Sequence, residues 1–109
     1  MTDRELIKKG YYEYKPTPFH DNSVEKAFQR RVKDEKGTKY FIDIEKYKPI
    51  IHPSTGEELG GGYEFTSQLR YKKNDCPLNL RMFAECTVEQ FEEFMENLFN
   101  TGMFMYYEE

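Results

Sequence analysis

One amphipathic segment near the C-terminus limits what the whole chain can fold into. Thr87 is followed three residues later by Gln90, a capping-box pattern that predicts the start of a helix. From there apolar residues recur at helical spacing and form a single stripe of Val88, Phe91, Phe94, Met95, Leu98 and Phe99. Such a stripe is stable when it is buried, so the rest of the chain must supply an apolar layer for it to cover.

The middle of the chain supplies that layer as strands. Apolar and polar residues alternate over 39–47, which is the clearest strand pattern, and again over 63–71 and 77–84. Segment 23–33 fits either a helix or a strand by its spacing. The glycine-containing turn pattern at 34–37 favours a strand there, paired as a hairpin with 39–47.

These elements predict an α+β fold in a single domain, 1–109. We expect a two-layer sandwich with an antiparallel sheet of about four strands, the order α-β-β-β-β-α, and the C-terminal helix packed on one face. The first helix is a short one over 2–9, ended by Gly10. The predicted buried layer comprises Phe28, Tyr40, Ile42, Ile44, Phe65, Leu69, Leu80, Met82, Phe91, Phe94, Leu98 and Phe99.

Two further segments lie outside these regular elements, and their predictions differ. Pro49, Pro53, Gly56 and the run 60–62 predict that 48–62 is a long Gly/Pro-containing loop. Residues 103–107 are apolar and predicted to be extended, with pairing either within the chain or between two chains.

Composition narrows the class of protein. Of 109 residues, 17% are aromatic, which excludes a disordered tail, and the net charge is -4. A negative chain is a poor duplex binder, so nucleic acid is disfavoured as the main partner. The N-terminus does not read as a signal peptide, and no run approaches a membrane span. We expect a soluble cytoplasmic protein whose two cysteines are reduced.

Residues with catalytic or metal-binding chemistry are few and scattered. The two histidines, His20 and His52, and the two cysteines, Cys76 and Cys86, lack the short spacing of a zinc site. No phosphate loop, dinucleotide fingerprint or nucleophile elbow is present. We therefore predict no cofactor, no metal and no catalytic residues. The least favoured alternative is an enzyme that uses the 48–62 loop as a lid, with an acid or base from His52, Glu57 or Glu58.

Acidic residues concentrate at the C-terminal end. Residues 85–109 contain seven glutamates and no lysine or arginine, a charge of -7, whereas the rest of the chain carries +3. The predicted helix therefore presents Glu89, Glu92 and Glu96 on its polar side, where they can steer a basic partner. The alternative is a solvated helix face that only keeps the protein in solution.

The outer face of the predicted sheet is the second candidate surface. If Ile42 and Leu80 point inward, then aromatic and arginine side chains point outward at Arg31, Phe41, Arg70, Arg81 and Phe83. The alternative is that the aromatic N-terminal segment, 11–19, covers this face. We predict a small non-enzymatic protein–protein interaction module, such as an adaptor, inhibitor or immunity-type protein. Its partner is either an unknown protein, for which the acidic helix favours a basic one, or a second copy in a homodimer. The alternative function is binding of single-stranded nucleic acid through the same face.

Overall fold

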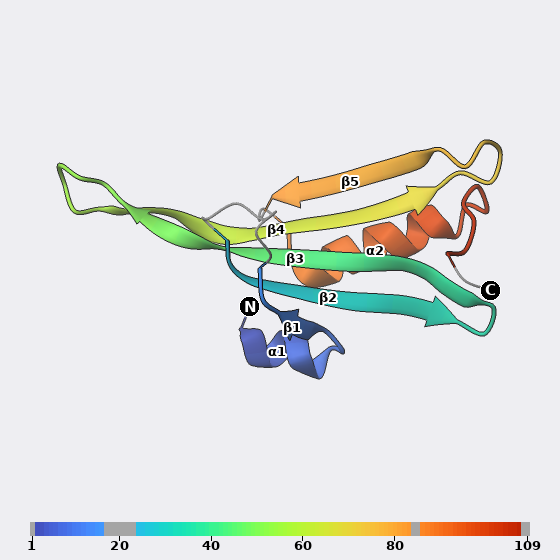
Figure 1. Ribbon diagram of the computed structural model, residues 1–109, viewed down its shortest axis with the longest axis horizontal. Helices are drawn as coiled ribbons and strands as arrows, with labels where there is room; N and C mark the ends of the chain where they lie inside the picture. The colour runs from blue at the N-terminus through green and yellow to red at the C-terminus, as the bar shows by residue number, and fades with distance from the viewer. Residues whose placement is uncertain (1, 17–23, 84–85, 108–109) are drawn as a thin grey trace.

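The computed structural model describes residues 2–16, 24–83 and 86–107, without the side chains of residues 59, 60 and 83. It contains two helices and five strands (Figure 1). In chain order these are α1 (Asp3–Lys8), β1 (Tyr12–Tyr14), β2 (Val24–Asp34), β3 (Gly37–Ile51), β4 (Glu58–Arg70), β5 (Pro77–Phe83) and α2 (Val88–Phe99).

The five strands form one antiparallel sheet in the order β1-β2-β3-β4-β5, so each strand pairs with its neighbour along the chain. This confirms the α+β class and the antiparallel sheet, and the described part of segment 23–33, residues 24–33, is a strand. The hairpin turn between β2 and β3 places Gly37 at φ 139°, a conformation that favours glycine. The unpredicted strand is β1, whose three residues pair with 27–29 of β2 and are too few for a periodic signal.

The prediction of a long irregular loop over 48–62 is wrong. β3 continues through Pro49 to Ile51, β4 starts at Glu58, and only the short turn between them is irregular. Among residues 24–83 and the other described ranges, β3 and β4 pair only with each other in this stretch, since β2 first pairs at Tyr47 and β5 ends opposite Glu64. A proline is tolerated in such a two-stranded ribbon, because one side of the strand has no neighbour that needs its N–H. Figure 1 shows the ribbon projecting from the body of the domain.

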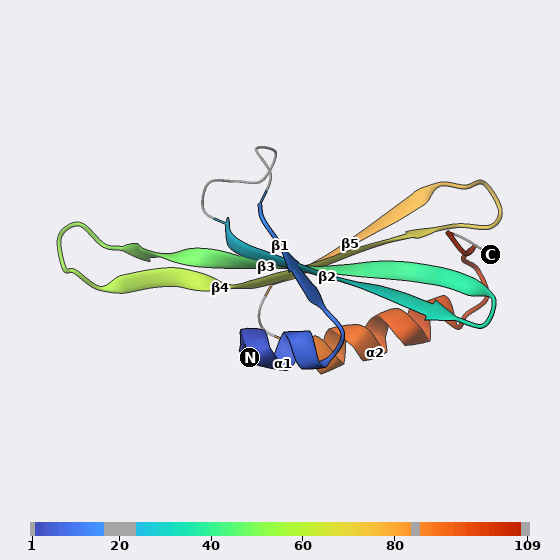
Figure 2. The ribbon, with the colours of Figure 1, turned by 60° about the horizontal axis from the view of Figure 1, so that its bottom comes forward.

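The core lies between the sheet and α2. Both helices pack on the same side of the sheet (Figure 2), which confirms the predicted position of the C-terminal helix. Phe65 of β4 stacks on Phe91 of α2, with ring centroids 5.5 Å apart. The fully or nearly fully buried side chains include Leu6, Phe28, Ile42, Ile44, Phe65, Leu69, Phe91 and Met95.

One predicted core residue, Phe94, is 40% exposed. The buried stripe of α2 is narrower than the predicted one and consists of Val88, Phe91, Met95 and Phe99. Phe94 lies on one flank of that stripe, beyond the contact with the sheet, and Leu98 one turn later is half-buried. Leu80 and Met82 of β5 are also half-buried rather than buried.

The segment after α2 pairs within the chain. Phe104 forms an isolated bridge with Tyr71, and the Met105 N–H donates to the Arg70 carbonyl at 2.9 Å. The Tyr107 N–H donates to the Thr38 carbonyl at 2.8 Å. The chain thereby crosses the end of the sheet and carries Tyr107 to its opposite face.

Candidate functional site

The sheet face opposite the two helices, here called the open face, is the candidate site (Figure 2). Strand alternation and the pairing register place its side chains: Asp43 of β3 lies between Gln29 of β2 and Thr66 of β4, and Thr66 faces Arg81 of β5. The face comprises Tyr12, Tyr14, Gln29, Arg31, Phe41, Asp43, Glu45, Tyr47, Glu64, Thr66, Gln68, Arg70, Asn79 and Arg81.

Four predicted contact residues lie on this face, namely Arg31, Phe41, Arg70 and Arg81. The fifth, Phe83, belongs to β5 and pairs with Glu64, but its side chain lies outside the described residues. The pleat alone explains this grouping, because residues two apart on a strand share a face.

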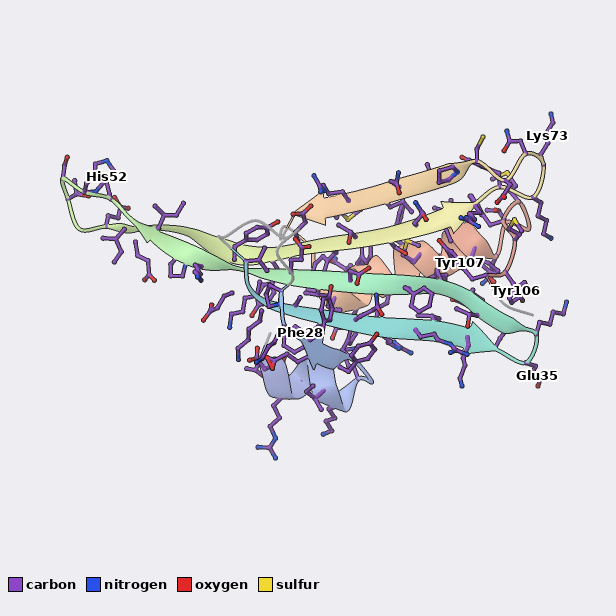
Figure 3. The ribbon with its side chains drawn as sticks, in the orientation of Figure 1. Phe28, Glu35, His52, Lys73, Tyr106 and Tyr107 are labelled. Carbon is purple, nitrogen blue, oxygen red and sulfur yellow. The ribbon has the colours of Figure 1, made fainter. Side chains whose placement is uncertain are left out.

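An aromatic group occupies one end of the open face. The Phe41 ring meets the Tyr107 ring edge-on, with centroids 5.8 Å apart. The Arg70 guanidinium lies 5.6 Å from the Tyr107 centroid, a cation–π contact, and the Tyr107 hydroxyl donates to the Gln68 carbonyl at 2.9 Å. Burial raises the pKa of Tyr107, and the charge of Arg70 opposes the shift. The C-terminal segment is therefore in contact with Phe41 (Figure 3 labels Tyr107).

Of the N-terminal tyrosines, expected as an alternative cover for this face, Tyr12 and Tyr14 lie at its β1 edge. Tyr11 is buried in the core, and Tyr12 and Tyr14 lie beside β2, across from Gln29 and Ala27. Phe19, the last aromatic residue of that predicted segment, lies outside the described residues.

Three carboxylates occupy the centre of the open face. Glu45 and Glu64 are direct cross-strand partners, an arrangement that is unfavourable for two bare negative charges. The Tyr47 hydroxyl lies between them, 3.0 Å from Glu45 Oε2 and hydrogen-bonded to Glu64, and Arg81 forms an ion pair with Glu64. Burial and hydrogen bonding to both carboxylates raise the pKa of Tyr47. Tyr47 and Arg81 together hold the like charges in place.

The third carboxylate, Asp43, is held by two neighbours. Gln29 Nε2 donates to Asp43 Oδ1 at 2.9 Å, and the Tyr14 hydroxyl donates to the same oxygen at 3.4 Å. Burial, together with the charges of Asp43 and Glu45, raises the pKa of Tyr14 to about 12. The acidic centre is thus a connected polar network rather than a row of loose side chains.

A shallow hollow of about 550 Å³ opens beside this network. Its lining is predominantly polar, so it suits a polar or charged side chain better than an apolar one. The lining residues are Asp43, Glu45, Thr66, Ser67, Gln68, Asn79, Leu80 and Arg81. Alternation along β3 predicts that Asp43 and Glu45 point outward, but it does not show which strands flank them.

The three predicted contact acids of α2 lie on the other side of the sheet, away from the open face. Glu92 accepts hydrogen bonds from Lys9 Nζ at 3.2 Å and the Tyr11 hydroxyl at 3.3 Å, and it pairs with Arg30. Burial and the Glu92 charge raise the pKa of Tyr11.

Glu96 and Glu89 also have partners in the chain. Glu96 pairs with Lys39 and accepts from the Tyr40 hydroxyl at 2.7 Å. Although burial opposes it, these bonds lower the pKa of Glu96. Glu89, whose side chain is 62% exposed, lies 3.3 Å from Lys9 Nζ.

The residues expected for an enzymatic alternative lie at the tip of the β3–β4 ribbon. His52 Nδ1 accepts from the backbone N–H groups of Ser54 at 3.1 Å and Thr55 at 3.3 Å, so it acts as a turn residue. Figure 3 shows His52 at the end of the molecule opposite Tyr106 and Tyr107. Within the described ranges, no three His, Cys, Asp or Glu side chains gather closely enough to hold a metal ion.

The fold and this face define a class: a small α+β domain with one helix-covered sheet face and one open face. Comparison with known protein families, curated proteins and solved structures finds no match to the chain. Neither helix of the described part of the chain is long and apolar enough to span a membrane.

Proposed function

We propose that this protein is a small non-enzymatic interaction module that binds a partner protein through the open face. The observation that carries the proposal is the position of both helices on one side of the sheet, so that no helix of the described residues covers the other side (Figure 2). The side chains on this side are restrained by one another, as in the Gln29–Asp43 and Tyr107–Gln68 contacts. A surface restrained before binding loses less conformational entropy when a partner docks.

The charge of the open face suggests the chemistry of the partner. Two carboxylates of the acidic centre, Asp43 and Glu45, line the polar hollow. A lysine or arginine side chain from a partner would complement their charge there. The aromatic and arginine group at the other end, Phe41 with Arg70, is of the type that dominates contact energies in protein interfaces.

The same observations weigh against single-stranded nucleic acid. Stacking requires an accessible ring face beside free positive charge, whereas Phe41 lies against Tyr107 and Arg81 is paired with Glu64. The carboxylates at the centre repel phosphates. A labelled oligonucleotide should therefore show no mobility shift at low salt, and a shift that weakens steeply with added salt would favour this alternative.

A substitution that fills the hollow tests the proposal. Thr66 lines the hollow and lies on a central strand, so Thr66→Arg places a long charged side chain where a partner is expected. The matched control is Ile50→Arg, which adds the same side chain to the ribbon at a residue that is 63% exposed. Circular dichroism and thermal melting establish that both variants fold.

The readout is quantitative affinity capture followed by titration calorimetry with the purified partner. We expect proteins that are retained by the wild type and by Ile50→Arg to be lost with Thr66→Arg, with at least a tenfold weaker dissociation constant. Equal retention by both arginine variants would contradict binding through the open face.

The contribution of the acidic helix α2 to partner binding is tested with a charge reversal that does not disturb the fold. Reversal of Glu92 or Glu96 removes bonds that hold α2 to the rest of the fold, so it perturbs stability as well as charge. Glu93 is exposed and lies on the same helix, so Glu93→Lys isolates the effect of charge. If Glu93→Lys leaves partner retention unchanged, α2 does not contribute by its charge.

A further inference from the structure

We infer that β5 is a self-association edge: two copies of this chain pair β5 with β5, antiparallel and centred on Leu80. This joins two five-stranded sheets into one continuous sheet. The inference is separate from the proposed function, because it uses the rim of the sheet and not its open face.

The backbone of β5 is available for such pairing. β5 is the last strand in the sheet order, so among the described residues only β4 pairs with it. The Tyr71 N–H donates to the Cys76 carbonyl at 3.0 Å, and this bond sets the phase of the β4–β5 ladder. Because hydrogen-bonded and non-bonded pairs alternate, Leu78, Leu80 and Met82 bond to β4. The backbone groups of Asn79 and Arg81 therefore point away from β4.

The position of Pro77 agrees with this phase. Pro77 lies opposite Arg70, two residues before Asn79, so its missing N–H falls on the free side of the strand. A proline in this phase leaves the ladder to β4 intact.

The side chains beside this edge are apolar and incompletely covered. Leu78, Leu80 and Met82 point to the helix side of the sheet, yet all three are only half-buried. Figure 2 shows β5 rising away from α2. On α2, Glu92 and Glu96 face β2 and β3, so the opposite flank, with Phe94 at 40% exposure and Leu98, is the one toward β5. Free backbone groups next to an apolar strip are a template for pairing with another strand.

The sequence of β5 is self-complementary, and this favours a second copy over an unrelated strand. In Pro77–Phe83 the middle residue is Leu80. A two-fold antiparallel pair centred there sets Leu80 against Leu80 and Leu78 against Met82 on the helix side. On the open side Asn79 faces Arg81, so no like charges meet.

The hydrogen-bonding phase is compatible with this register. Asn79 of one copy and Arg81 of the other both direct their backbone groups outward, so each such pair exchanges both N–H···O bonds. A register centred on Arg81 would instead set two arginines against each other. Hydrogen-bonding phase, apolar pattern and charge thus all permit the isologous contact centred on Leu80.

The first test measures mass in solution. Light scattering and sedimentation over a dilution series should show wild-type protein passing from twice the mass of one chain to the monomer mass. Asn79→Pro removes an outward N–H without touching the ladder to β4, so it should be monomeric throughout, with an unchanged far-ultraviolet spectrum. Asn79→Thr keeps the N–H and should associate like the wild type. A wild type that is monomeric at every concentration, or a proline variant that dimerises equally, would overturn the inference.

The second test reads the register and does not depend on the proline variant. With Cys76 and Cys86 replaced by serine, Leu80→Cys places two thiols at a non-hydrogen-bonded cross-strand pair, where Cα atoms lie about 4.5 Å apart. That separation is within disulfide range, so mild oxidation should give a covalent dimer. Asn79→Cys, whose thiols would point to the open side and lie offset, should give none. Absence of the Leu80→Cys dimer, or equal cross-linking of both, would refute the register.

The two hypotheses fail separately. Thr66→Arg should abolish partner capture and leave the mass measurement unchanged, whereas Asn79→Pro should abolish self-association. Loss of dimerisation in Thr66→Arg would contradict the inference that β5 alone carries it.

Discussion

The clearest energetic prediction concerns Glu92, which ties α2 to two other elements. Its carboxylate accepts from Lys9 beyond α1 and from Tyr11 before β1, and it pairs with Arg30 of β2. Only 17% of the Glu92 side chain is exposed. Glu92→Gln keeps the size of the side chain and removes its charge, so it isolates the electrostatic part of these contacts.

The expected cost follows from the exposure of the partners. Arg30 is 36% and Lys9 is 31% exposed, so both cations regain water when the charge opposite them is removed. The cost is therefore below the roughly 3–5 kcal/mol of breaking a fully buried pair. Two part-exposed ion pairs at about 0.5–1 kcal/mol each predict a loss of roughly 1–2 kcal/mol in the free energy of unfolding. In a domain of this size that lowers Tm by roughly 5–10 °C.

The assay is urea unfolding, with thermal melting as a second measure. Glu93→Gln is the matched control, because it removes the same charge from the adjacent, exposed residue and should change stability by less than about 0.5 kcal/mol. In a double-mutant cycle, Arg30→Gln combined with Glu92→Gln should cost less than the sum of the two single changes. Equal stability of the Glu92→Gln and Glu93→Gln variants would refute the reasoning.

Three further predictions concern the other ties of α2. The pKa of Glu96 lies below its ordinary value of 4.5. Its ionised form therefore stabilises the fold above pH 4.5, and this stabilisation is lost as the pH falls through the lower pKa of the native state. The urea midpoint should accordingly fall less steeply with acidification in Glu96→Gln than in the wild type. Burial raises the pKa of Tyr40 above its ordinary value of 10.0. The neutral side chain therefore stabilises the fold fully below pH 10, and this stabilisation is lost as the pH rises further. The urea midpoint should decline less steeply at alkaline pH in Tyr40→Phe than in the wild type. Met95 is fully buried and Phe94 is 40% exposed, so in urea unfolding Met95→Ala should cost about 2–5 kcal/mol, and Phe94→Ala about 1 kcal/mol. Equal losses of stability in Met95→Ala and Phe94→Ala would contradict the observation that Met95, and not Phe94, lies on the buried side of α2.

The parts of the fold that local signals determine were predictable. Thr87 accepts from the Gln90 N–H at 3.1 Å and Gln90 Oε1 accepts from the Thr87 N–H at 2.8 Å, so the capping box seen in the sequence forms. The alternation over 39–47 placed Ile42 and Ile44 in the core, where both are fully buried. Such signals are readable because the residues that interact are close in sequence.

The β3–β4 ribbon was not predictable in the same way. Proline and glycine oppose a strand that has neighbours on both sides. Pro49, paired with Gly60, lies where β4 is the one strand of the described structure that pairs with β3. Gly61 and Gly62 adopt φ values of 74° and 108°, which glycine tolerates without strain. Whether a third strand is present depends on residues far along the chain, and composition alone does not report it.

In the candidate site too, features set by local sequence patterns were predictable, and contacts between distant segments were not. Membership of the open face follows from the two-residue strand period, so Arg31, Phe41, Arg70 and Arg81 were grouped correctly on one side of the sheet. The contact between Phe41 and Tyr107 joins residues that are far apart in the sequence. The return of the C-terminal segment across the end of the sheet leaves no local signature in 103–107.

The charge of α2 shows why order along the chain is a poor guide to surface charge. The segment 85–109 carries -7 in the sequence, yet folding brings Arg30 to Glu92 and Lys39 to Glu96, over separations of 62 and 57 residues. A glutamate held by a cation at contact distance contributes little field to a distant partner. Glu92 and Glu96 therefore act within the chain, where their ion pairs hold α2 to the sheet. The surface proposed for recognition is the open face, where Asp43 and Glu45 are held by polar neighbours beside a polar hollow.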